Sequence, residues 1–176
     1  MHKDVKEILI SQEEISAKCK ELAKRIDNDY QGKELILVGL LKGSVPFLAE
    51  LSKNIELDIT FGYMDVSSYE GVQSCSLAIK QDLDQDVEGK DILLVEDILD
   101  TGKTLSTVKA MLEERGASSV EIVTLLDKKE GRLYPIEAKY VGFEIPNAFV
   151  IGFGLDFNEK YRNLPYVGIL KEECYQ

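Results

Sequence analysis

Three carboxylates and a short polar loop follow one another between residues 96 and 104. Glu96 and Asp97 end the apolar run ILLV, and Asp100 comes three residues after Asp97. The loop that follows consists of Thr101, Gly102, Lys103 and Thr104. A loop of small residues that opens a helix presents free backbone N–H groups to an anion. Paired carboxylates bind vicinal hydroxyls or a divalent metal. Together these groups suit a sugar phosphate.

Two simpler explanations remain open for this stretch. Asp100, Thr101 and Gly102 can form an ordinary turn after a strand. Thr101 or Thr104 can cap the helix that follows. A P-loop fits less well, because that motif requires glycine at the position of Asp97.

The elements around this stretch alternate between strand and helix. Apolar spacing predicts helices over 11–29, 46–54 and 104–116, and the first has the capping-box spacing of Ser11 and Glu14. Continuous or alternating apolar runs predict strands at 34–40, 57–63, 91–96, 119–126, 139–143, 148–154 and 166–170. Continuous apolar strands indicate a parallel sheet that is covered on both faces. Ligands of such sheets bind at the carboxyl ends of the strands, where Glu96 and Asp97 stand.

Composition limits the class of protein. The 176 residues, 44% of them hydrophobic, predict a single domain over 1–176. No apolar run is long enough for a membrane span, and the N-terminus does not resemble a signal peptide. Three separated cysteines favour a reducing, cytoplasmic location, and the only histidine, His2, gives no support to a zinc site or a catalytic triad. The net charge of -11 argues against nucleic acid as a partner.

The run ILLVEDILDTGKT resembles the signature that binds phosphoribosyl pyrophosphate (PRPP) in type I phosphoribosyltransferases. Its form is that of the hypoxanthine-guanine members. Four further segments resemble that family in the same order, namely 38–51, 67–71, 125–132 and 141–168. The resemblance implies the α/β fold of the type I phosphoribosyltransferases. That fold has a central, mostly parallel sheet flanked by helices, a small hood formed by the terminal segments and a mobile lid hairpin.

The reaction that the resemblance implies joins PRPP to hypoxanthine or guanine and releases pyrophosphate, giving IMP or GMP. Glu96 and Asp97 are then expected to hold the ribose hydroxyls, directly or through Mg²⁺, and to stabilise positive charge on the sugar ring. Asp100 matches the general base at the purine N7. The 5′-phosphate loop matches Thr101, Gly102, Lys103 and Thr104.

The remaining site residues are also carried over from the resemblance. Pyrophosphate contacts are expected from Leu41, Lys42, Gly43 and Arg162, with a cis peptide before the lysine in the family. Purine contacts are expected from Lys128, Phe149, Val150 and Asp156, and Asp156 is a third candidate Mg²⁺ ligand. Ser68 and Tyr69 match the start of the lid. Without the resemblance, Lys128 and Arg162 fit solvated surface charges, and Phe149 fits a core residue.

Other functions remain open on this fold. The base can be xanthine or uracil in a relative with another preference. The chain can also be an RNA-binding regulator, or a module that binds PRPP without turnover. Family members are usually homodimers or homotetramers.

Overall fold

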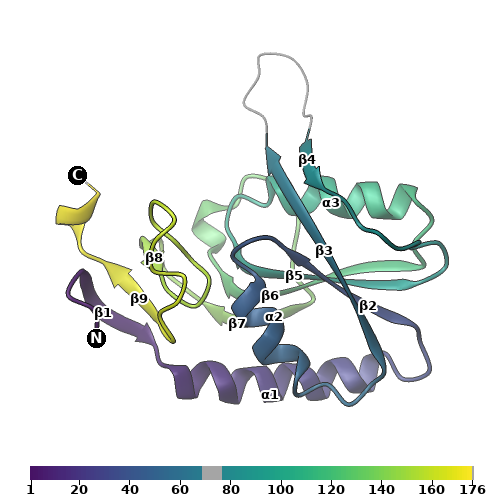
Figure 1. Cartoon of the computed structure of the whole chain (residues 1–176), viewed down its shortest axis with the longest axis horizontal. Coiled ribbons are helices and arrows are strands. Elements are labelled where there is room, and N and C mark those ends of the chain that lie inside the picture. The colour runs from purple at the N-terminus through teal and green to yellow at the C-terminus, as the bar shows by residue number, and fades with distance from the viewer. Residues whose placement is uncertain (69–76, 176) are drawn as a thin grey trace.

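The computed structural model describes residues 1–68 and 77–175, which fold into a large sheet with helices on both faces and a smaller sheet beside it (Figure 1). The helices are α1 (Gln12–Asp29), α2 (Val45–Ser52) and α3 (Lys103–Glu114), with short 3₁₀ turns η1 (Lys129–Gly131) and η2 (Glu172–Cys174). The strands are β1 (Val5–Ile10), β2 (Leu35–Leu40), β3 (Ile59–Ser68), β4 (Leu77–Gln81), β5 (Asp91–Leu99), β6 (Ser119–Asp127), β7 (Tyr140–Glu144), β8 (Val150–Ile151) and β9 (Val167–Leu170).

The large sheet has the strand order β4-β3-β2-β5-β6-β7. Its strands run parallel except for β4, which pairs antiparallel with β3. Successive side chains of a strand point to opposite faces. Accordingly, Leu37 and Leu93 pack in the core beneath α1 and α2, while Ile36 and Ile92 pack beneath α3. The predicted parallel sheet, covered on both faces, is confirmed.

The two longer helices form largely as their sequences predict. Ser11 and Glu14 make the expected capping box, and α1 buries Ile15, Cys19, Leu22, Ala23 and Ile26 along one face. Gly116, with φ of 86°, follows the end of α3. The N-cap of α3 is Gly102, with no side-chain hydrogen bond, so the interpretation of Thr101 or Thr104 as the cap is wrong.

A separate three-stranded sheet, β1-β9-β8, joins the two ends of the chain and forms the expected hood. Figure 1 shows it beside the large sheet, with both termini nearby. The strand predicted over 148–154 is only two residues long, β8. Gly152, Phe153 and Gly154 all have φ between 49° and 101°, in the left-handed region, and a strand cannot continue there.

Two further strands differ from the sequence prediction. On β3, Phe61 and Tyr63 are exposed, while Gly62 and Met64 are buried, because Leu83 and Gln85 cover that face at Gly62. Strand β5 continues past Glu96 to Leu99, since Ile98 and Leu99 still pair with β6. The expected lid, with Tyr69, lies outside the described residues, and Ser68 is the last residue of β3. None of the described helices is both long and apolar enough to cross a membrane.

Candidate active site

Glu96 and Asp97 lie inside β5 near its carboxyl end, where Glu96 pairs with Thr124 of β6. Asp97 is only 8% exposed. Burial raises the pKa of both carboxyls, and the neighbouring Asp97 carboxylate raises the pKa of Glu96 further. The backbone N–H of Ile98 donates to Asp97 Oδ1 over 2.8 Å. This buried acidic pair suits a partner that donates hydrogen bonds or carries positive charge.

The turn after β2 lies directly against Asp97. A Cβ on Gly43 would stand 1.9 Å from Asp97 Oδ2, so only glycine fits there without a shift. The peptide between Leu41 and Lys42 is cis, as the family resemblance implies. A Cβ on Gly154 would in turn stand 1.9 Å from the carbonyl oxygen of Gly43. The hood, the Leu41–Gly43 turn and the acidic pair are therefore in close contact.

The loop between β5 and α3 encloses a cavity of about 160 Å³. The cavity is lined by Glu96, Ile98, Leu99, Asp100, Thr101, Gly102, Lys103, Thr104 and Leu105. Gly102 has φ of 83°, and a Cβ there would meet Ile136 Cγ2 at 2.5 Å. Helix α3 begins at Lys103, beside this loop, and the N-terminus of a helix favours an anion. The phosphate-binding role of residues 101–104 stays a prediction, and their place at a helix N-terminus is consistent with it.

Asp100 and Lys128 meet across the ends of β5 and β6. Lys128 Nζ lies 3.1 Å from Asp100 Oδ2, and the side chain of Lys128 is 15% exposed. A Cβ on Gly131 would stand 1.9 Å from Asp100 Oδ1, so the carboxylate rests against that backbone. The structure therefore brings the expected base and the expected purine-reading lysine together.

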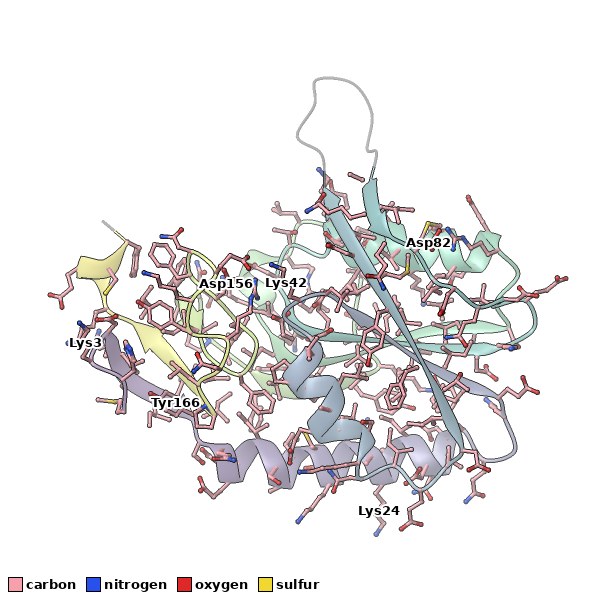
Figure 2. All side chains as sticks on the ribbon, in the orientation of Figure 1. Lys3, Lys24, Lys42, Asp82, Asp156 and Tyr166 are labelled. Atoms are coloured by element: carbon pink, nitrogen blue, oxygen red, sulfur yellow. The ribbon has the colours of Figure 1, made fainter. Side chains whose placement is uncertain are left out.

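The hood contributes a second group of charges, close to Lys42 (Figure 2). Arg162 Nη2 lies 3.0 Å from Asp156 Oδ1, and Arg162 Nη1 donates to the carbonyl of Gly154 over 2.7 Å. Glu159, which the sequence interpretation passed over, lies 2.7 Å from Lys42 Nζ and 3.1 Å from Arg162 Nη2. These two cations lower the pKa of Glu159, so it is ionised at neutral pH. Lys42 and Arg162, expected on pyrophosphate, share one carboxylate.

Phe149 and Val150 stand at the edge of the hood. The ring of Phe149 is 40% exposed, stacks on Tyr175 at 5.1 Å and meets Phe157 edge to face at 5.5 Å. Val150 is buried and pairs with Ile169 of β9. Phe149 is therefore not a fully packed core residue, and its exposed ring can stack on a flat ligand.

Mg²⁺ fits this donor set only in part. Its preferred ligands are oxygens, and it is usually held by one or two carboxylates together with substrate phosphates. Glu96 and Asp97 offer buried carboxylates, whereas both oxygens of Asp156 are engaged, one by Arg162 and one by the N–H of Glu159. Within residues 1–68 and 77–175 no group of three metal-ligating side chains is assembled. A bound Mg²⁺ would thus need oxygens from the substrate.

Comparison with known proteins shows the family to which the chain belongs. Residues 5–158 match the family model of the phosphoribosyl transferase domain. The chain belongs to the phosphoribosyltransferase family. A curated relative, the hypoxanthine-guanine phosphoribosyltransferase of Streptococcus thermophilus (strain CNRZ 1066), is 54% identical over 99% of this chain and 98% of its own length.

Solved phosphoribosyltransferase structures also superpose closely. A crystal structure of a hypoxanthine phosphoribosyltransferase from Staphylococcus aureus is 50% identical, with a TM-score of 0.96 over 100% of this chain and 97% of that one. The hypoxanthine phosphoribosyltransferase from Trypanosoma cruzi, in complex with the product IMP, is 39% identical, with a TM-score of 0.95 over 99% of each chain. The type I phosphoribosyltransferase fold expected from the sequence is confirmed.

Proposed function

We propose that this protein transfers the 5-phosphoribosyl group of PRPP to hypoxanthine and guanine, giving IMP and GMP with release of pyrophosphate. The observation that carries the proposal is the contact of 3.1 Å between Lys128 and Asp100, which itself lines the cavity of residues 96–105. A donor for a 6-oxo group and an acceptor for an N7 proton are then side by side. The full-length relatives named for this activity support the same assignment.

PRPP is bound by two parts of the segment 96–104, the carboxylates Glu96 and Asp97 and the loop 101–104. The 5′-phosphate accepts from the N–H groups and hydroxyls of residues 101–104, in the cavity of about 160 Å³. Glu96 and Asp97 accept from the ribose hydroxyls, and their charge stabilises the oxocarbenium character that develops at the sugar. Glu96 and Asp97 would hold Mg²⁺, which would supply neutralisation of the charge on the pyrophosphate leaving group.

The pyrophosphate lies between the hood and the turn after β2. Backbone N–H groups of Lys42 and Gly43 and the side chain of Lys42 donate to it from one side, and Arg162 donates from the other. Guanidinium and ammonium groups are strong phosphate donors. The carboxylate of Glu159 leaves the two cations as the phosphates arrive, since it makes only exposed contacts with them.

The purine is bound through stacking on its ring plane and through polar contacts with its edge. Phe149 stacks on the ring, the backbone of Val150 reads the edge, and Asp156 lies nearby. Lys128 donates to the 6-oxo group, and because an ammonium cannot accept, it disfavours the 6-amino group of adenine. Asp100 accepts the N7 proton while N9 attacks the sugar carbon.

A cytoplasmic location belongs to this proposal, since the two cysteines of the described part of the chain, Cys19 and Cys174, are free thiols. A homodimer or homotetramer is also expected. Light scattering on the protein as it elutes from a size-exclusion column measures its mass and tests this expectation.

The test supplies PRPP and Mg²⁺ with each of hypoxanthine, guanine, xanthine, adenine and uracil in turn. Turnover with hypoxanthine or guanine, and none with adenine or uracil, supports the proposal. Turnover only with xanthine or uracil would keep the mechanism and reject the assigned base. PRPP binding without any turnover would indicate a binding module instead.

A further inference from the structure

The guanidinium of Arg132 contacts the backbone at Asp100 and also two residues outside that loop, Asp127 and Ile136. Its Nε donates to the carbonyl of Asp100 over 2.9 Å, Nη1 donates to the carbonyl of Ile136 over 2.6 Å, and Nη2 donates to the carbonyl of Leu99 over 3.4 Å. Nη2 also forms an ion pair with Asp127 Oδ1. The side chains of Arg132 and Asp127 are only 16% and 6% exposed. This buried clamp therefore joins the end of β5 to the segment after β6.

The contacts of the clamp depend on the shape of arginine. A guanidinium holds its donors in one rigid plane and stays charged, so it can fix several carbonyls at once. The ion pair with Asp127 orients that plane from the neighbouring strand, where Asp127 stands beside Leu99 in the β5–β6 register. A lysine at this position keeps the charge but cannot reproduce the fork.

The segment 128–134, which contains Arg132, also contacts the Asp100 side chain and the backbone that follows it. Lys128 contacts one carboxylate oxygen of Asp100, and the backbone of Gly131 lies against the other. The N–H groups of Leu133 and Tyr134 donate to the carbonyl of Thr101 over 3.0 and 3.1 Å. The position of the Asp100 carboxylate is therefore set by residues 128–134, and Arg132 joins that segment to the Asp100 backbone.

We propose that Arg132, oriented by Asp127, is a positioning residue for the base. It holds the peptide of Asp100 so that the carboxylate faces the purine N7 beside Lys128. Arg132 is not among the residues that line the cavity of residues 96–105, and all three of its guanidinium nitrogens have partners within the protein, so we infer that it acts through Asp100. This inference rests on the proposed function of Asp100.

The test compares Arg132→Ala and Arg132→Lys with the wild type. We expect kcat with hypoxanthine to fall by about 10- to 100-fold in both variants, the size of effect that small misplacements of a catalytic group produce. The dissociation constant of PRPP, measured without purine, is expected to stay within about twofold, because Glu96 and the 101–104 loop are retained. Guanidinium ion at non-denaturing, millimolar concentration is expected to restore part of kcat to Arg132→Ala, and not to Arg132→Lys.

A matched control is available in Arg115, which donates from two nitrogens to Asp82 over 2.8 and 2.7 Å at the end of α3. Arg115→Ala removes a more exposed arginine–aspartate pair away from Asp100, and it is expected to leave kcat unchanged, with no response to guanidinium. An equal loss of kcat in Arg115→Ala would overturn the inference.

The double variant Asp127→Asn, Arg132→Met separates positioning from folding. It leaves no unpaired buried charge, so its melting temperature is expected to lie above that of Arg132→Ala. Its kcat is expected to remain low. If kcat recovers together with stability, or if the single variants keep wild-type kcat, Arg132 does not position the base. A wild-type protein without turnover would overturn the proposed function and this inference with it.

Discussion

The ammonium of Lys128 lies 3.1 Å from the carboxylate of Asp100, although 28 positions separate the two residues in the chain. The parallel pairing of β5 with β6 brings them together, because both strands end at the same edge of the sheet. One side chain can only donate and the other, when ionised, only accepts. A 6-oxopurine presents the complementary pattern at its O6 and N7, which is why this contact decides between bases.

Replacing the base tests its chemical role. Asp100→Asn keeps the size of the side chain but cannot take up a proton, so kcat with hypoxanthine is expected to fall by about 10²–10⁴-fold, the usual contribution of a general base. PRPP affinity, measured by calorimetry, is expected to change little. A variant with near-wild-type kcat would remove Asp100 from that role.

Lys128→Ala is expected to raise the KM for hypoxanthine by about 10- to 100-fold, as the loss of a hydrogen bond from a charged donor predicts. The KM for PRPP is expected to change much less. The neighbouring Lys129, which is exposed and pairs with Glu144, provides the matched control Lys129→Ala. Equal losses for both substrates in steady-state kinetics would contradict the assignment of Lys128 to the purine.

Glu159 competes with phosphate for Lys42 and Arg162. Glu159→Gln keeps the hydrogen-bonding shape and removes the charge, so pyrophosphate is expected to bind about two- to five-fold more tightly, since exposed ion pairs are weak. Glu21→Gln, which breaks the exposed pair with Lys18 on α1, is the control. Weaker binding by Glu159→Gln would mean that Glu159 supports Arg162 instead of competing for it.

The buried acidic pair predicts a conflict between stability and function. Because burial raises the folded-state pKa of Glu96, the stability tied to its protonated form is lost as pH rises above its unfolded pKa of about 4.3. Glu96→Gln is therefore expected to melt higher than the wild type without metal, by about 2–4 °C for each 1 kcal/mol gained. The difference in melting temperature between the variant and the wild type is expected to grow as pH rises above about 4.3.

The same variant is expected to lose part of the melting-temperature increase that PRPP gives the wild type, because a ligand stabilises the folded state in proportion to its affinity. Thermal unfolding with and without PRPP measures both effects. A lower melting temperature for Glu96→Gln at neutral pH would show that the charge of Glu96 is satisfied within the protein.

The elements that position the site could be predicted from local sequence. The capping box and the apolar face predict helix α1, and the continuous apolar runs predict the strands. Each of these patterns depends only on residues that are close together in the chain. The meeting of Asp100 with Lys128 could be expected only from the resemblance, since DKKEGR alone reads as a solvated loop. The roles of the predicted site residues remain proposals.

Other features depend on contacts that no local pattern reveals. Phe61 and Tyr63 alternate like buried residues, yet the segment near Leu83 covers the opposite face of β3. The 148–154 run is apolar, but its backbone is left-handed at Gly152, Phe153 and Gly154, and Gly154 lies so close to Gly43 that no Cβ fits there. Arg132 and Glu159 went unnoticed because a charged residue in a polar loop carries no sign of its distant partners. For Arg132, the sequence offered one signal. Asp127 is a carboxylate at the carboxyl end of a buried strand, and such a group needs a partner.

The measurement that tests the central claim most directly is formation of nucleotide by the purified protein from PRPP, Mg²⁺ and hypoxanthine, with adenine in a parallel reaction. The account predicts IMP and stoichiometric pyrophosphate from hypoxanthine, and no AMP from adenine. Nucleotide formation from adenine at a comparable rate, or none from hypoxanthine, would contradict the account of Lys128 and Asp100 as the pair that recognises and deprotonates a 6-oxopurine.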